Sequence, residues 1–173
     1  MAILVDDAIW PWRGRRWAHL VSDAAYGELH AFASDLGLRR MAFQGDHYDV
    51  PAEVREKALV LGAEAVEGRE LLRRLKASGL RLPPGRRPGS WVELGVWRDI
   101  AAAGEADVPA GVLLALEGVS ADSEIDEVSA WRRGDEHALA VSSSGRLRVG
   151  EVPIGVEHRL TDGARLLELL AGC

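Results

Sequence analysis

The segment SDAAYGELHAFASDLG, residues 22–37, predicts an amphipathic helix. Ser22 and Asp23 are typical of a helix N-cap, and Gly37 is typical of the residue that follows a helix. Between them, apolar side chains recur along one helical face: Ala25, Leu29, Phe32, Ala33 and Leu36. This helix is the first connection in an alternating order of strands and helices that decides the expected fold.

Short apolar runs on both sides of this helix predict the strands of a sheet. The first strand is expected at residues 2–5, the second at 38–43 and the third at 63–66. Two further helices are expected at residues 51–62 and 70–77. The resulting order, β-α-β-α-β-α, is typical of an α/β fold in which crossover helices connect a short parallel sheet.

A segment rich in Pro, Gly and Arg, residues 82–90, predicts a linker. It would separate an α/β domain at residues 1–81 from an acidic, strand-rich α+β region at residues 91–173. Weaker patterns in the second region predict four elements: a strand at 111–116, a hairpin at 137–149, a strand at 152–160 and a closing helix at 164–170.

Composition and charge restrict the class of protein. The longest apolar run, residues 108–116, is too short to cross a bilayer, and the chain has a single cysteine, Cys173. We therefore expect a cytoplasmic protein without internal disulfides and without a membrane partner. Residues 1–89 carry 14 Lys and Arg against 12 Asp and Glu, whereas residues 90–173 carry 7 against 15. The first part could accept a polyanion, and the second part would repel one.

The motif DHYD, residues 46–49, is the clearest candidate for a functional site. It lies in a tight connection bounded by Gly45 and Pro51. A structural turn needs Gly, Pro and at most one Asp, and it does not need a His and a Tyr between two carboxylates. We therefore predict catalytic roles for three residues of this motif: His47, Tyr48 and Asp49.

Carboxylates follow the first two predicted strands, with Asp6 after the first and Asp46 and Asp49 after the second. If the strands are parallel, their carboxyl ends share one rim, where open α/β sheets bind ligands. Three carboxylates beside an imidazole predict a site for Mg²⁺ or Mn²⁺. An alternative stays open, in which each Asp is a solvated residue or a helix cap, as Asp49 would be for the helix expected at 51–62.

The segment WPWRGRRW, residues 10–17, combines aromatic rings with guanidinium groups in the loop predicted after the first strand. Trp rings can stack on bases, and Arg can grip phosphate or carboxylate. We predict that five of its residues bind substrate: Trp12, Arg13, Arg15, Arg16 and Trp17. In the alternative interpretation, the rings pack under the loop and the Arg side chains are solvated.

Seven short blocks occur in order over about the first 80 residues: Val5-Asp6, His19 with Ser22-Asp23, Glu28-Leu29-His30, Leu36-Gly37, His47-Tyr48-Asp49, Gly62-Ala63 and Arg69-Glu70. Together they resemble a small bacterial and phage domain catalogued as domain of unknown function 4031, whose hallmark is the His-Tyr-Asp tripeptide. The resemblance implies that six residues belong to the family pattern: His19, Asp23, His30, His47, Tyr48 and Asp49. It implies no activity. His19 and His30 join the predicted substrate-binding residues, although His30 could also be a partly buried structural residue.

These patterns favour a divalent-metal-dependent phosphoester hydrolase that acts on nucleic acid or on a phosphorylated small molecule. Asp6, Asp46 and Asp49 would bind Mg²⁺ or Mn²⁺, and His47 would be the general base or a further ligand. The alternative is a non-catalytic module that binds a nucleotide, nucleic acid or a protein with the same rim. A third hypothesis is a structural adaptor, in which changes at His47 or Asp49 alter stability but no ligand binding.

Overall fold

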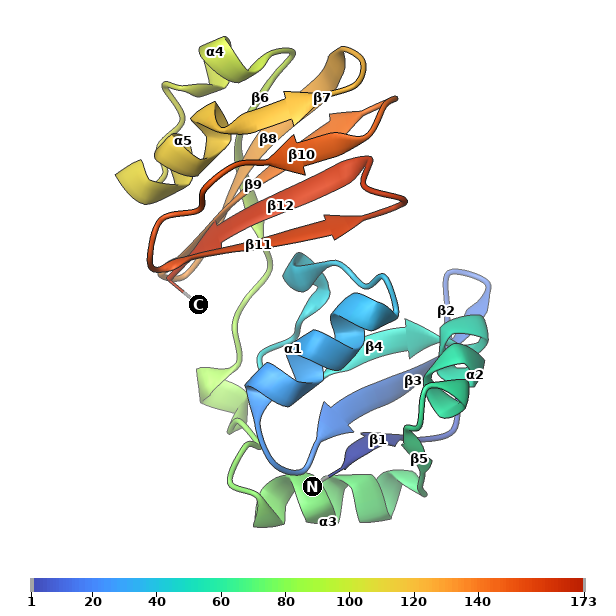
Figure 1. Ribbon diagram of the computed structural model, residues 1–173. Coiled ribbons are helices and arrows are strands. Elements are labelled where there is room, and N and C mark those ends of the chain that lie inside the picture. Colours follow the sequence, from blue (N-terminus) through green and yellow to red (C-terminus); the bar gives the residue numbers. More distant parts are fainter. Residues whose placement is uncertain (1, 173) are drawn as a thin grey trace. The chain divides into compact units, whose positions relative to one another are not determined.

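The computed structural model describes residues 2–172, and the chain divides into two compact units (Figure 1). Unit 1 is Met1–Arg87, and unit 2 is Pro88–Cys173. Across the described residues, no helix combines the length and the apolar character that a membrane crossing requires.

Unit 1 is an α/β unit built on a mixed sheet of five strands. The strands are β1 (Ile3–Val5), β2 (Trp10–Trp12), β3 (Arg15–Ser22), β4 (Tyr48–Pro51) and β5 (Glu64–Ala65). The helices are α1 (Tyr26–Asp35), α2 (Ala52–Val60) and α3 (Gly68–Ala77), with short 3-10 helices η1 (Arg40–Ala42) and η2 (Pro84–Arg86). The strand order is β2-β3-β1-β5, and β4 also pairs with β3. The expected α/β class is therefore confirmed.

The sheet is mixed, which corrects the expectation of a wholly parallel sheet. β1 and β5 run parallel, but β3 is antiparallel to β1, β2 and β4. The predicted strand at 38–43 is wrong, because that segment forms η1 and a single bridge from Phe43 to Tyr48. A hairpin, β2–β3, lies where a loop was expected. Its turn residues Arg13 and Gly14 have φ angles of 49° and 73°, the left-handed values of a type I′ turn.

Alternate residues of the strands in unit 1 face two separate cores. The first core joins the sheet to α1 and α2, and it includes Val5, Leu20, Leu29, Val50 and Ala58. The second core joins the opposite face to α3, and its buried residues are Leu4, Val21, Leu71 and Leu75. Because β1 alternates between the two cores, both of its faces are covered and its three residues are buried.

Unit 2 is strand-rich, as expected, and its main sheet is antiparallel. Its elements are β6 (Val92–Trp97), α4 (Ile100–Ala103), α5 (Ala110–Glu117), β7 (Val119–Ala121), β8 (Ile125–Arg133), β9 (Glu136–Ser143), β10 (Leu147–Val149), β11 (Val156–Thr161) and β12 (Leu166–Ala171). Five strands form a sheet in the order β11-β12-β9-β8-β6, and β10 pairs with β7 in a separate ribbon. Its core includes Val112, Leu116, Leu139, Val141, Leu167 and Leu169.

Three expectations for unit 2 are corrected. The strand predicted at 111–116 is the helix α5, which buries Val112, Ala115 and Leu116 at helical spacing. The helix predicted at 164–170 is the strand β12, which lies between β11 and β9. The hairpin predicted at 137–149 is wrong, because β9 pairs with β8 and β12 whereas β10 pairs with β7. Short apolar runs do not distinguish helix from strand by period alone.

Candidate metal centre

One face of the β2–β3–β4 sheet gathers polar and aromatic side chains. Residues directly opposed in antiparallel strands point to the same side, and alternate residues of one strand do so as well. Trp10 is opposed to Trp17, Trp12 to Arg15 and His19 to Asp49. These side chains therefore share the face that carries Val21, which packs on α3 farther along the sheet. At the β2 end the face is open, because Trp10 and Trp12 are 58% and 55% exposed.

His19 is held in place by Asp6, the residue that follows β1. The Nδ1 atom of His19 lies 2.8 Å from Oδ2 of Asp6, and the backbone N–H of His19 donates to Oδ1 of the same carboxylate at 2.6 Å. Asp6 is buried. A carboxylate at Nδ1 favours the tautomer with its proton on that atom, so the lone pair of Nε2 points away from Asp6.

His47 is held in the same way by Asp46. Its Nδ1 lies 2.6 Å from Oδ1 of Asp46, which is completely buried. The other carboxylate oxygen of Asp46 accepts from the backbone N–H of Leu82 at 2.9 Å and from Nη1 of Arg81 at 3.2 Å. Asp46 is therefore fully engaged in the interior, and it orients His47 with Nε2 toward the open face.

The two imidazoles converge on Asp49. Its Oδ1 lies 3.4 Å from Nε2 of His47 and 3.9 Å from Nε2 of His19. One ligand atom from each of these residues lies within 4.8 Å of the other two. Three ligands bound tetrahedrally at about 2.1 Å from a common ion are separated by about 3.4 Å. We call His19, His47 and Asp49 the triad. Small side-chain rotations would bring its three ligand atoms to an ion, so these residues could hold a metal.

The charges of the triad are coupled. Burial lowers the pKa of His47, but hydrogen bonds and charge interactions with Asp49 and Asp46 outweigh it, so the net shift is upward. Burial raises the pKa of Asp49, but the hydrogen bond to His47 and the charges of His47 and His19 bring it below its ordinary value. Both shifts favour the charged form of the side chain relative to the free residue. A divalent cation would supply positive charge at the same place.

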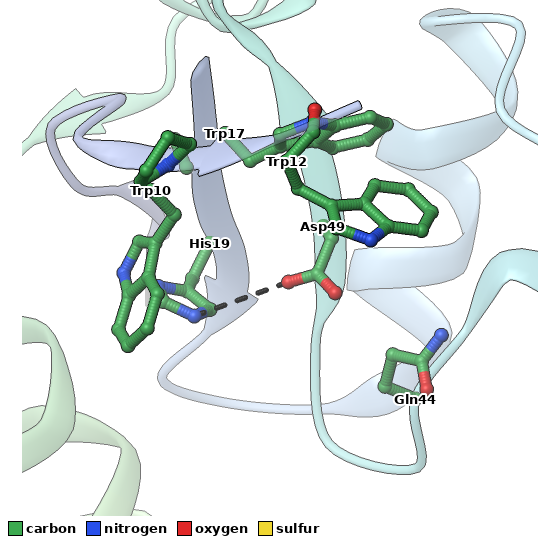
Figure 2. A pocket seen from close by; sticks show the side chains of 8 residues that line it. Trp10, Trp12, Trp17, His19, Gln44 and Asp49 are labelled. Carbon is green, nitrogen blue, oxygen red and sulfur yellow. Dashed lines mark hydrogen bonds and ion pairs between the residues drawn. The ribbon is translucent and has the colours of Figure 1, made fainter. Parts of the chain in front are cut away.

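A cavity of about 460 Å³ opens on two residues of the triad, His19 and Asp49 (Figure 2). Figure 2 shows the ring of Trp10 on one side, the ring of Trp12 on the other, and His19 and Asp49 between them, with Gln44 at the margin. We call this space the tryptophan cavity; its lining residues are Trp10, Pro11, Trp12, Trp17, Ala18, His19, Gln44 and Asp49. It combines aromatic walls with a polar floor.

A second cavity, also of about 460 Å³, borders the triad near α3. It shares Trp10 and His19 with the tryptophan cavity and adds His47 and two cations, Arg81 and Arg87. Its apolar wall comes from α3 and comprises Leu71, Leu72 and Leu75. Trp10 and His19 therefore lie between two spaces that could hold different parts of one ligand.

Tyr48 and His30, both predicted site residues, lie on the opposite face of the sheet. Tyr48 is completely buried, and its hydroxyl lies 2.9 Å from Nδ1 of His30. Both rings pack on Phe43. They form an aromatic cluster between α1, which carries His30, and the sheet, which carries Tyr48 and separates this cluster from the triad.

The predicted arginines are not gathered at one place. The guanidinium of Arg13 lies over the ring of Trp12, with its carbon 4.5 Å from the ring centre. Arg15 shares the face of the triad but pairs with Glu53 at 2.9 Å. Arg16 alternates with Arg15 along β3 and lies on the other face. Only Arg13 and Arg15 therefore lie beside the tryptophan rings.

Asp49 is not a helix cap, which removes one alternative interpretation of this residue. It lies within β4, and the N-cap of α2 is Pro51. Asp6 and Asp46 lie behind the imidazoles as hydrogen-bond acceptors, and neither belongs to the group that could hold a metal. Four residues that line the tryptophan cavity had no predicted role: Trp10, Pro11, Ala18 and Gln44. The spacing Trp10-Pro11-Trp12 contained a signal for Trp10, whereas nothing in the sequence distinguishes Gln44.

Comparison with known proteins finds a family model that is similar to most of unit 1. No curated protein and no solved structure matches the chain. A family model described as "Protein of unknown function (DUF4031)" matches residues 3–78, as the resemblance of the sequence blocks implied. The matched range contains the whole triad and both supporting carboxylates, but no family model matches unit 2. Residues 3–78 of this chain are therefore similar to the DUF4031 family.

Proposed function

We propose that unit 1 is a divalent-metal-dependent hydrolase that cleaves a phosphoester. The observation that carries this proposal is the convergence of two Nε2 atoms and one carboxylate on the open face of the sheet. Each imidazole is fixed from behind by a carboxylate, an arrangement common around catalytic metals. A histidine that only stabilises the fold does not need both a carboxylate partner at Nδ1 and an Nε2 atom that converges with other ligand atoms.

The proposed ligands are His19, His47 and Asp49. This assignment keeps Asp49 from the sequence prediction and gives Asp6 and Asp46 the role of orienting the histidines. Two imidazoles with one carboxylate suit Mn²⁺ or Zn²⁺ better than Mg²⁺, which prefers oxygen ligands. Of the two ions expected from the sequence, Mn²⁺ is therefore the better candidate. Three protein ligands leave coordination positions for water and substrate.

The surroundings of the triad suit a phosphoester. A divalent cation in such a site polarises a phosphoryl oxygen and makes water a better nucleophile near neutral pH. In the hydrolysis, the water oxygen bonds to phosphorus, the bond from phosphorus to the ester oxygen breaks, and a proton from water ends on the departing alcohol. Arg81 and Arg87 line the second cavity, and Arg13 lies over the ring of Trp12. Because Arg81 pairs with Asp46, Arg13 and Arg87 supply most of the positive charge that would attract an anionic substrate.

The first experiment measures metal binding and hydrolysis on the full chain. We expect isothermal titration with Mn²⁺ and Zn²⁺ to give one site, and metal-dependent cleavage of bis(4-nitrophenyl) phosphate. His47→Ala should abolish both. Asp49→Asn, which alters a half-exposed side chain without changing its size, should do the same with little risk to folding. The matched control is His158→Ala, which removes an exposed imidazole from β11 of unit 2.

The results separate the hypotheses. A protein that binds metal but cleaves no phosphoester would contradict the hydrolase and leave a metal-binding module. Equal metal binding by wild type, His47→Ala and Asp49→Asn would contradict the proposed centre itself. The exposure of Trp10 and Trp12 favours a second candidate function, non-catalytic binding of a nucleotide or nucleic acid, which would depend on these rings and on Arg13 and not on His47.

A further inference from the structure

We infer that the tryptophan cavity binds a nucleobase, so that the substrate of unit 1 is a nucleotide ester with its phosphate at the triad. The assignment of the reaction rests on the proposed function, but the binding of the base does not. The observation is a juxtaposition: two exposed indole rings stand on either side of a cavity whose floor is His19 and Asp49 (Figure 2).

The two rings offer flat apolar surfaces to a planar guest. Trp10 and Trp12 are alternate residues of β2, so both indoles project from the same side of the strand. His19 and Asp49 lie between the two rings, so a planar ring system in the cavity would stack on one indole (Figure 2). We place it on Trp12, the ring that Trp17 supports. An aliphatic chain would use less of each aromatic surface.

The hairpin holds these rings in a defined geometry. The indole N–H of Trp17 donates to the backbone carbonyl of Trp12 at 3.0 Å, and the rings of Trp12 and Trp17 meet edge to face with centres 5.4 Å apart. The ring of Trp10 meets the imidazole of His19 edge to face at 5.8 Å. The walls of the cavity are therefore ordered before a ligand arrives, which lowers the entropic cost of binding.

Polar groups at the cavity match the rest of a nucleotide. Gln44 is anchored by its backbone N–H, which donates to the carbonyl of His47 at 2.8 Å, and its amide lies at the margin, where a base edge would pass (Figure 2). The guanidinium of Arg13, on the hairpin turn, has no carboxylate partner among the described residues and stacks on Trp12. The amide could bind the edge of a base, and the guanidinium adds positive charge at the Trp12 wall of the cavity.

The size of the cavity limits the guest to one nucleotide unit. About 460 Å³ falls in the range of about 300–1,000 Å³ that is usual for small-molecule sites. The second cavity continues past Trp10 and His19, with Arg81 and Arg87 on its lining. A longer strand could therefore follow the same face, whereas a free nucleotide would fill the tryptophan cavity alone. A nucleic-acid strand and a free nucleotide would present the same chemistry, a base joined through a sugar to a phosphate.

The test measures binding to the full chain by isothermal titration in EDTA, so that it does not depend on metal or on hydrolysis. The probes are adenosine monophosphate, ribose 5-phosphate, which lacks the base, and an eight-residue oligothymidylate. We expect adenosine monophosphate to bind at least 10-fold more tightly than ribose 5-phosphate. Trp12→Ala should weaken its binding roughly 5- to 150-fold, whereas Trp12→Phe, which keeps an aromatic face, should retain most of the affinity.

The choice of variants separates a loss of base stacking from a loss of folding. Trp12 is more than half exposed, and the hydrogen bond from Trp17 goes to its backbone, so alanine removes the ring alone. Tighter binding of the oligonucleotide than of the mononucleotide would support a strand as the source, and equal binding would support a free nucleotide. Equal affinity for adenosine monophosphate and ribose 5-phosphate, or equal affinity of wild type and Trp12→Ala, would overturn the inference. Hydrolysis of bis(4-nitrophenyl) phosphate without base binding would overturn it and leave the proposed function intact.

Discussion

The two faces of the sheet in unit 1 use the same residue type for different purposes. On the face covered by α1, His30 of that helix meets the hydroxyl of the completely buried Tyr48 and packs among aromatic rings. On the open face, His19 and His47 each meet a buried carboxylate at Nδ1 and turn Nε2 toward Asp49. The chemistry available to an imidazole is thus decided by the groups that contact its two nitrogen atoms. The presence of the histidine in a sequence motif does not decide that chemistry.

The largest expected effect tests whether only the open face binds metal. His19→Ala should lower the affinity for Mn²⁺ or Zn²⁺ more than 100-fold, since it removes a proposed ligand, and loss of a supporting partner alone typically costs about 10- to 100-fold. His30→Ala should leave metal affinity unchanged and lower the stability of unit 1, because it leaves a gap beside Phe43 and Tyr48. Isothermal titration and denaturant unfolding measure the two effects. A large loss of metal affinity in His30→Ala would break the comparison.

The next effect concerns the carboxylate behind an imidazole. Asp46→Asn should weaken metal binding about 10- to 100-fold, because an amide can place its NH₂ group against Nδ1 and orients the ring less strongly than a carboxylate. The matched control is Asp7→Asn, whose side chain is 71% exposed and pairs with Arg55. If both variants bind metal with wild-type affinity, the buried carboxylate does not support the centre.

A smaller effect, on stability, is expected for a change between α1 and the sheet. Tyr48→Phe removes one buried hydroxyl and its hydrogen bond to His30, and should lower the free energy of unfolding by about 1 kcal/mol. Metal affinity and phosphodiester cleavage should stay at the wild-type level. The denaturation midpoint of unit 1, followed through amide signals of β4 and α1, measures the change. A loss of cleavage without a loss of stability would restore the catalytic role that the sequence motif predicted for Tyr48.

Part of the fold could be predicted because its signals are local. The apolar run at residues 2–5 contains β1, and the periodic segment that ends at Gly37 contains α1. The parallel partner of β1 was also expected close to its true place, at β5. β3 was missed because arginines at its start conceal its alternation, in which Trp17 and His19 face one side and Ala18 the other. Its role as the centre of an antiparallel ribbon depends on pairing with β4, about 30 residues later in the chain.

The contrast between local signals and long-range pairing also explains which parts of the candidate site could be predicted. His47 and Asp49 were predicted site residues because an imidazole beside carboxylates is unusual in a turn. His19 was predicted from the family resemblance. Their roles could not be assigned, because Asp46 and Asp49 look equivalent in sequence. The difference comes from Arg81 and Leu82, which bind the carboxylate of Asp46 from 35 and 36 residues away and keep it in the interior. Such long-range partners decide which carboxylate orients an imidazole from the interior and which one faces a bound ligand.

The smallest expected effect concerns the helix on the face of the triad. α3 is tied to the start of the chain by Arg74, whose Nε donates to Oδ2 of Asp23 at 3.0 Å, and Asp23 also accepts from the backbone N–H of Ala2 at 2.7 Å. Burial raises the pKa of Asp23, but the hydrogen bonds from Arg74 and Ala2 outweigh it, so the net shift is downward. Asp23→Asn should therefore reduce stability at neutral pH, by less than Tyr48→Phe, because the pair is partly solvated.

The sign of its pH dependence follows from the lowered pKa. A carboxyl that is more acidic in the folded state stabilises the fold fully above its unfolded pKa of about 3.9, and this contribution disappears as the pH falls through the folded value. The difference in denaturation midpoint between wild type and Asp23→Asn should therefore be constant above about pH 5 and shrink below about pH 4. A difference that grows on acidification would show that Asp23 gains no stabilisation from its charge, and that the packing of Leu71 and Leu75 holds α3 on the sheet without it.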